Sequence, residues 1–97
     1  MAYGLVLVFA GVTEADYWAV NTALGIDKDG TGDWPAGLQF HSGGTVASGG
    51  FVVTEVWVDK PTQEAFMASR LGPALGQVGV PDPVQVIETE VFNTHSG

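Results

Sequence analysis

The sequence contains no cysteine and very few basic residues. The first absence excludes disulfides, thiol catalysis and thiolate metal sites. Lysine and arginine number 3 against 11 aspartate and glutamate residues, so the formal net charge is -8. An acidic surface repels polyanions and is therefore a poor partner for nucleic acids, phosphate-rich ligands and anionic membranes. We expect neither a nucleic-acid partner nor a membrane partner.

Charge of either sign is scarce. Charged residues make up 14% of the chain and hydrophobic residues 45%, whereas an average soluble domain is roughly 25% charged. Disordered chains are poor in apolar residues and rich in charge, so disorder is excluded. The 97 residues form one domain, residues 1–97. Because a domain of this size buries only about 60% of the surface of its unfolded chain, the apolar surplus predicts a partner surface, a ligand cavity or both.

A secretory signal peptide has a basic residue before its apolar stretch, but no basic residue precedes the apolar stretch at residues 4–12. The first basic residue is Lys28, and the stretch runs directly into the acidic segment that follows Thr13. The stretch is also far shorter than the ~20 apolar residues of a membrane-spanning helix. We interpret it as a buried strand and expect a cytoplasmic protein.

The spacing of the apolar residues predicts four strands and two helices. Strands are expected at residues 3–11, 37–42, 51–59 and 84–92. One helix follows Thr13, with Asp16 completing a capping box, and ends at Gly25. The other begins at Pro61 and should be kinked or divided by Pro73. The order βαββαβ predicts an α+β ferredoxin-like fold, a four-stranded antiparallel sheet with both helices on one face.

Two of the expected strands are apolar on both faces, at residues 5–9 and 51–58. Helices cover only one face of such a sheet, so the second apolar face needs another cover. A second copy of the same sheet would supply it, and two such sheets would enclose a cavity. The pattern therefore predicts a homodimer that holds a hydrophobic small molecule between its sheets.

Four segments carry a family resemblance: WPAGLQFHSGG (34–44), EVWVD (55–59), QEAFMASRLGPAL (63–75) and VIETEVF (86–92). They resemble the dimeric α+β barrel superfamily, and within it the small proteins grouped with the antibiotic biosynthesis monooxygenases. The resemblance implies a ferredoxin-like homodimer. It also implies activities that range from cofactor-free oxygenation of polyketide quinones and lactone isomerisation to haem degradation. The haem-degrading members carry a proximal histidine on the second helix, which this chain lacks, and we expect no cofactor.

His41 is expected inside a strand, out of phase with Leu38 and Phe40. If those two pack under the helices, His41 points into the cavity of the dimer. A lone carboxylate beneath helices would be costly to bury, so we place Glu55 and Trp57 on the cavity side as well. His41 would then be a catalytic general base oriented by Glu55, and Trp57 a wall of the substrate site. The alternative is that His41 is a rim residue or forms a hydrogen bond across the dimer interface.

The first helix carries three candidate substrate-binding residues, Tyr17, Trp18 and Asn21. Adjacent helical residues point in different directions, so only one of Tyr17 and Trp18 should face the cavity; the alternative for both is ordinary core packing. The acidic loop at residues 27–33 imitates the start of a calcium-binding loop. However, Leu38 stands where such a loop needs a bidentate glutamate, and we expect no metal site.

Two functional hypotheses follow from this set of residues. The leading one is a small enzyme that acts on an apolar, aromatic or polyketide-like molecule by cofactor-free oxygenation or by a proton-transfer rearrangement. The second is a non-catalytic binding module for a hydrophobic small molecule. Catalysis predicts a histidine that faces a closed pocket, whereas binding predicts a pocket whose polar residues can be removed with little effect.

Overall fold

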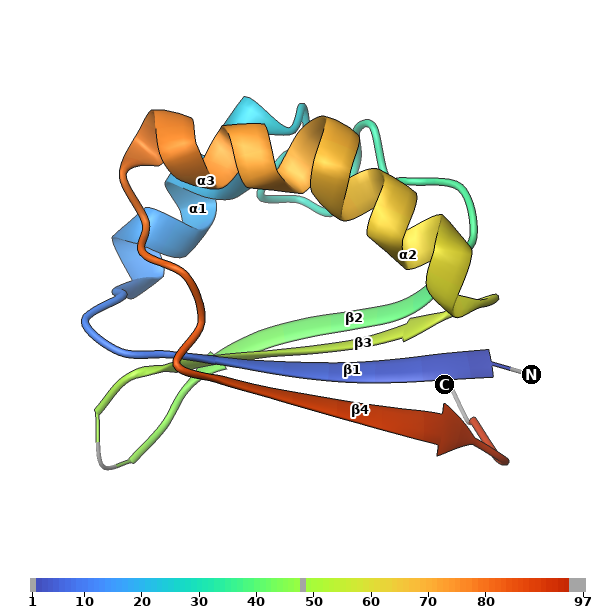
Figure 1. Ribbon diagram of the computed structural model, residues 1–97. Helices are drawn as coiled ribbons and strands as arrows, with labels where there is room; N and C mark the ends of the chain where they lie inside the picture. Colours follow the sequence, from blue (N-terminus) through green and yellow to red (C-terminus); the bar gives the residue numbers. More distant parts are fainter. Residues whose placement is uncertain (1, 48, 95–97) are drawn as a thin grey trace.

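The computed structural model describes residues 2–47 and 49–94 and follows the expected order of elements (Figure 1). The elements are β1 (Ala2–Phe9), α1 (Glu14–Ala23), β2 (Leu38–Thr45), β3 (Phe51–Trp57), α2 (Lys60–Phe66), the π-helical segment η1 (Met67–Leu71), α3 (Gly72–Val78) and β4 (Gln85–Val91). The second histidine, His95, lies outside the described residues. In the described part of the chain, no helix has the length and apolar character that crossing a bilayer demands.

The four strands form one antiparallel sheet in the order β2-β3-β1-β4. Figure 1 shows α1 and the α2–α3 helix lying together on one side of this sheet. The prediction of an α+β ferredoxin-like fold with both helices on one face is therefore confirmed. The other face of the sheet carries no element of the described chain.

Local signals set the boundaries of the helices. Thr13 and Asp16 form the reciprocal capping box at the start of α1, and Asp59 caps α2. The second helix is divided, as expected, by a change in its hydrogen-bonding pattern. α2 passes directly into the π-helical turn η1, and α3 then begins beside Pro73. Proline lacks an N–H and its ring clashes with the preceding turn, and the wider π-helical turn accommodates this break.

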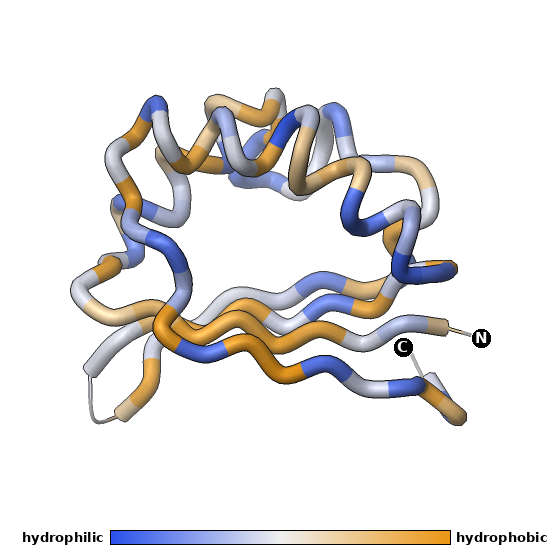
Figure 2. Tube along the Cα trace, in the orientation of Figure 1, coloured by the Kyte–Doolittle hydropathy of each residue, from blue (hydrophilic) through white to orange (hydrophobic). Residues whose placement is uncertain are grey.

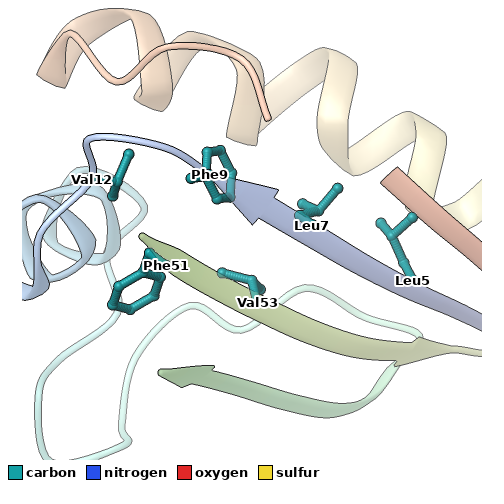
Figure 3. Close-up of a cluster of buried hydrophobic side chains, with 6 residues drawn as sticks. All are labelled: Leu5, Leu7, Phe9, Val12, Phe51 and Val53. Atoms are coloured by element: carbon teal, nitrogen blue, oxygen red, sulfur yellow. The ribbon is translucent and has the colours of Figure 1, made fainter. Parts of the chain in front are cut away.

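The hydrophobic core lies between the sheet and the helices (Figure 3). Alternate residues of β1 and β3 point to this side and, together with Val12, form one cluster: Leu5, Leu7, Phe9, Phe51 and Val53. The residues between them remain half-buried, because they point to the uncovered face: Val6, Val8, Val52, Thr54 and Val56. In the hydropathy view, apolar residues follow β1 along much of its length, whereas apolar and hydrophilic segments alternate along β4 (Figure 2).

Two expectations about side-chain direction are wrong. Glu55 and Trp57 lie under the helices, on the same side as Phe51 and Val53, and they are only 4% and 0% exposed. His41 pairs with Glu55 in the sheet and also faces the helices. The reason for the first error is that the buried carboxylate is not alone, since two side chains donate hydrogen bonds to it.

The reason for the second error is a β-bulge in β2. The register shifts between Leu38 and Phe40, so Leu38 pairs with Trp57 and Phe40 with Val56. A bulge adds one residue to one strand and reverses the alternation beyond it. Leu38 and His41 consequently share the face that the helices cover, while Phe40 points to the other face.

Candidate functional site

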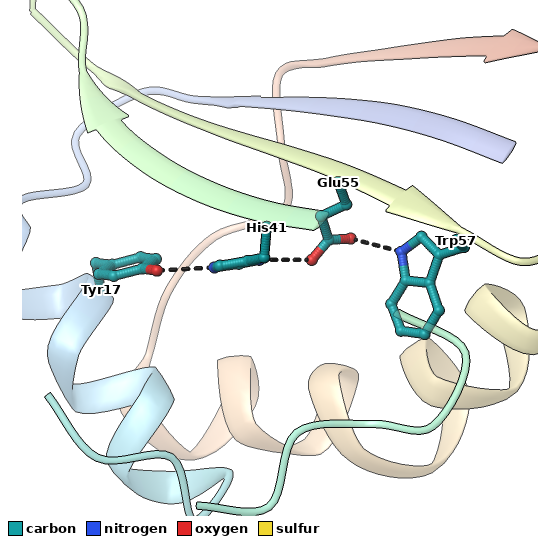
Figure 4. Close-up of polar contacts among 4 residues, drawn as sticks. All are labelled: Tyr17, His41, Glu55 and Trp57. Carbon is teal, nitrogen blue, oxygen red and sulfur yellow. Dashed lines mark hydrogen bonds and ion pairs between the residues drawn. The ribbon is translucent and has the colours of Figure 1, made fainter. Parts of the chain in front are cut away.

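Four side chains form a continuous row of hydrogen bonds between the sheet and α1 (Figure 4). The Tyr17 hydroxyl lies 2.7 Å from Nε2 of His41. Nδ1 of His41 lies 3.1 Å from Oε2 of Glu55, and the indole N–H of Trp57 donates to Oε1 of Glu55 at 3.1 Å. The expected contact between His41 and Glu55 is therefore present, although on the helix-covered side of the sheet.

The directions of these hydrogen bonds follow from the carboxylate. When Glu55 is ionised it only accepts, so Nδ1 of His41 carries a proton and donates. In the neutral imidazole Nε2 then offers a lone pair, and the Tyr17 hydroxyl donates to it. Both oxygens of Glu55 have a donor, which compensates for its burial. This arrangement fixes the orientation of the imidazole and places a proton acceptor behind a phenol.

A cavity of about 60 Å³ lies beside this row, bordered by the sheet, the helices and the loop that follows α1, and it is partly open to solvent. That volume is well above the ~10–15 Å³ that one water molecule needs. Most of the lining residues are apolar, and the polar ones gather on one side: Asp16, Tyr17, Asn21, His41 and Glu55. The space is therefore a small apolar chamber with a polar wall. It lies within one chain, whereas the sequence predicts a cavity between two sheets.

Tyr17 and Asn21 are the two candidates from α1 that line the cavity. They lie one helical turn apart, so they face the same direction. Asn21 is buried, and its backbone oxygen accepts hydrogen bonds from Leu24 and Ile26, while its side chain borders the chamber. The question of which adjacent aromatic residue faces the cavity is thereby answered in favour of Tyr17.

Trp18 and Trp57 do not line the cavity. The indole N–H of Trp18 donates to Glu14, and the ammonium of Lys28 lies 5.0 Å from its ring centroid, so its contacts are with charged surface residues. Trp57 is fully buried against Phe66, with ring centroids 5.3 Å apart. It contacts Glu55, not the chamber, and its hydrogen bond holds the carboxylate in position.

Trp34 lines the cavity but is not among the site residues predicted from the sequence. Its ring centroid lies 5.4 Å from that of His41, and its indole N–H donates to the carbonyl of Gly30. It lies in the loop between α1 and β2. The turn-forming residues of this loop predict irregular structure but do not indicate where its side chains point. The only signal in the sequence is an aromatic side chain placed directly before Pro35 and the strand that carries His41.

Arg70 holds this loop in place from η1. Its guanidinium donates to the carbonyl of Leu24 at 2.8 Å, at the start of the loop, and to that of Asp33 at 2.7 Å, directly before Trp34. The acidic residues at the loop tip are occupied locally, since Asp27 and Asp29 both accept from Thr31. In residues 2–47 and 49–94, no three acidic or histidine side chains gather as metal ligands would.

Comparisons with known proteins agree with this architecture. No family model matches the sequence, and no curated protein matches it. Among solved structures, a proposed antibiotic biosynthesis monooxygenase from Chloroflexus aurantiacus is similar with a TM-score of 0.70 and 15% identity, over 99% of this chain and 98% of that one. The Mycobacterium tuberculosis protein Rv0793 is similar with a TM-score of 0.70 and 16% identity, over 99% and 100%.

A third structure, a proposed antibiotic biosynthesis monooxygenase from Deinococcus radiodurans, is similar with a TM-score of 0.59 and 16% identity. The similarity spans 99% of this chain and 97% of that one. Matches of this length show that the chain has the fold expected from its resemblance to the antibiotic biosynthesis monooxygenases. At 15–16% identity they establish the fold alone.

Proposed function

We propose that this protein is a small enzyme that removes a proton from an apolar, aromatic or polyketide-like molecule bound in the chamber. His41 is the proton acceptor, and Glu55 orients its imidazole and stabilises the imidazolium that forms. Asn21 offers an amide to an oxygen of the substrate. The apolar lining provides the remaining contacts. The structural similarity to proposed monooxygenases supports the same class of reaction.

The carbanion left by this step can react in two ways. In a rearrangement, it takes a proton back at another atom. In an oxygenation, a CH2 group and one O2 give a C=O group and one H2O; carbon loses four electrons and O2 gains four, so the substrate itself is the reductant. Both reactions begin with the same proton transfer, and this common step is the one that the chamber supports.

The observation that carries the proposal is the row Tyr17–His41–Glu55 at the wall of an apolar chamber. A thermal-shift screen of aromatic ketones and phenols identifies ligands, and O2 uptake together with product absorbance then measures turnover. Anthrone is the first probe, because its CH2 is acidified by two aryl rings and a carbonyl. The molecule is larger than the chamber, so its CH2 edge enters while the outer rings stay on the side that is open to solvent. With a compound that turns over, His41→Ala should lower the rate by about 10²–10⁴.

The matched control is Gln39→Ala, since Gln39 lies two residues away on β2 and is exposed. It should keep the wild-type rate. Near-normal turnover by His41→Ala would contradict the assignment of the base.

The binding module remains a second candidate, because most of the lining is apolar. In that case ligands would bind without O2 uptake, isomerisation or exchange of their acidic protons. The His41→Ala variant would then retain the wild-type affinity, since apolar contacts would carry the binding energy. Measuring affinity and turnover on the same variants separates the two functions.

We also propose that a second copy of this chain covers the free face of the sheet. That face presents half-buried apolar side chains from the two central strands, including Val6, Val8, Val52 and Val56. A surface of this kind is costly to leave in water. The same face on another molecule is complementary to it, as two-fold symmetric pairing requires.

A further inference from the structure

Both ring nitrogens of His41 are already occupied. Nδ1 donates to Glu55, and Nε2 accepts from the hydroxyl of Tyr17 at 2.7 Å. An imidazole in this position has no free nitrogen with which to contact a ligand in the chamber. Tyr17 and His41 both line the chamber, and of the two it is the phenol oxygen that still has a lone pair free for a ligand.

The phenol is held firmly by its neighbours. The Tyr17 ring stacks on Phe51 with centroids 5.0 Å apart and meets the edge of Trp18 at the same distance. It lies nearly parallel to the His41 ring, at an angle of 16°. These contacts fix the ring plane, and the hydroxyl is consequently positioned before any ligand binds.

Electrostatics favour movement of the phenol proton toward His41. Protonation of Nε2 creates an imidazolium whose Nδ1 lies 3.1 Å from the carboxylate of Glu55. Opposite charges at this distance attract strongly in an interior of low polarity. Trp57 holds the second carboxylate oxygen in place. The positive charge on His41 is therefore compensated at the moment when the Tyr17 oxygen must accept a new proton.

We propose that Tyr17 is the catalytic residue that takes the proton from the substrate and passes its own proton to His41. In this step the substrate X–H bond breaks and its electron pair stays on the substrate. A new O–H bond forms on Tyr17, the old one breaks, and an N–H bond forms at Nε2 of His41. The net result is a substrate anion and an imidazolium. The inference rests on the proposed function and makes His41 act through Tyr17.

The substrate class follows from this geometry. The acidic C–H or O–H of the substrate points at the Tyr17 oxygen, and an adjacent oxygen lies toward Asn21, one helical turn along α1. A neutral enolisable aromatic ketone or a phenol meets both requirements. No Lys or Arg is among the described residues that line the chamber, so a carboxylate or phosphate would find no counter-charge from them.

The test uses anthrone with the full-length protein and the variants Tyr17→Phe, His41→Ala and Tyr3→Phe. Tyr3 is the only other tyrosine and lies outside the chamber, which makes Tyr3→Phe a matched control. We expect Tyr17→Phe to lower turnover by about 10²–10⁴, as removal of an acid–base group does. Binding of anthrone and the melting temperature should change little, and Tyr3→Phe should keep the wild-type rate.

A second measurement separates proton transfer from simple positioning. Incorporating 3-fluorotyrosine or 3,5-difluorotyrosine at position 17 keeps the ring and the hydroxyl but makes the phenol progressively more acidic. If Tyr17 carries the proton, the rate and the pH profile should shift progressively with phenol acidity. A hydroxyl that merely holds His41 in place would leave the pH profile unchanged.

The possible outcomes are distinct. Loss of turnover in Tyr17→Phe with a graded fluorotyrosine series supports the inference. Near-normal turnover in Tyr17→Phe, together with loss in His41→Ala, overturns the inference and leaves the proposed function standing. An unshifted pH profile in the fluorotyrosine series also overturns it. If the wild-type protein does not accelerate proton exchange or oxidation of any compound that binds, the proposed function fails and the inference fails with it.

Discussion

Gly43 of β2 lies directly against the ring of Tyr17, so that a Cβ added at Gly43 would come within 2.7 Å of Tyr17 Cε1. It would also lie 3.2 Å from Phe51. A glycine inside a strand often marks a place where another group approaches the backbone closely. Here the missing side chain provides the space that lets the phenol reach His41.

We therefore expect Gly43→Ala to displace Tyr17 and to break its hydrogen bond to His41. Overpacking of this kind costs about 1–3 kcal/mol of unfolding free energy, and turnover should fall together with stability. Urea unfolding and O2 uptake measure the two effects. Gly44→Ala is the matched control, because a Cβ at Gly44 meets nothing within 4 Å, and it should behave as wild type.

Trp57→Phe should destabilise the fold more than it weakens ligand binding. The substitution removes the only donor to Oε1 of Glu55 among the described residues, and a buried acceptor without a partner costs about 1–3 kcal/mol. The smaller ring also leaves a void beside Phe66. In a Glu55→Met background the same substitution should cost less, because no carboxylate is left without a donor. Equal costs in the two backgrounds would contradict this account.

Local sequence signals predict the order of elements well. The capping box at Thr13 and the break at Pro73 require no knowledge of distant residues. The face on which His41 lies could not be predicted, because one bulged position before Phe40 reverses the side-chain alternation of β2. The strand is too short and too rich in small residues for its hydrophobic pattern to reveal the bulge.

Burial of Glu55 could not be predicted from the cost of desolvation alone. That cost is offset by partners that only the folded chain supplies, including His41, which is 14 residues away in sequence. Likewise, the loop that carries Trp34 is fixed by Arg70 through the carbonyl of Asp33, 37 residues before Arg70. The residue types of the site are readable in the sequence, but their contacts depend on these long-range pairings.

Arg70→Ala should loosen the loop that covers the chamber. The substitution removes two hydrogen bonds from a charged donor, and bonds of this kind contribute about 1.5–3 kcal/mol each. Hydrogen exchange should quicken at the amide of Asp33, which donates to Gly25 across the loop. Lys28→Ala removes the same charge from a surface position and should change exchange at Asp33 little. Comparable exchange rates in the two variants would show that Arg70 does not hold the loop.

The ion pair between Lys60 and Glu88, with Nζ and Oε2 2.9 Å apart, should make a small pH-dependent contribution to stability. The hydrogen bond and charge of Lys60 lower the pKa of Glu88, and Glu88 in turn raises the pKa of Lys60. The stabilisation from Glu88 is therefore complete above the usual carboxyl range and is lost as the pH falls through its lowered pKa. That from Lys60 is lost as the pH rises through its raised pKa.

Glu88→Gln should abolish this dependence, and the melting temperature measured across pH at low and high salt should reveal it. Both side chains are about half exposed, so the effect should be weak and screened by salt. Glu90→Gln is the control, since Glu90 follows on the same strand and takes part in neither of the ion pairs found in residues 2–47 and 49–94. If the loss of stability at acidic pH persists unchanged in Glu88→Gln, other carboxylates are its cause.

The uncovered sheet face should hold two copies of the chain together. A stable interface needs about 800 Å² from each partner, and the free face offers apolar side chains along both central strands. Sedimentation at micromolar concentration should therefore give about twice the mass of the 10.1 kDa chain.

Val56→Asp places a charge on β3 within this face and should produce a monomer. Ala65→Asp, on the exposed side of α2, adds the same charge and should remain a dimer. A wild-type protein that sediments as a monomer, or a Val56→Asp variant that stays dimeric, would exclude this face as the interface. Either result would leave the assignment of the chamber unchanged, because its described lining comes from one chain.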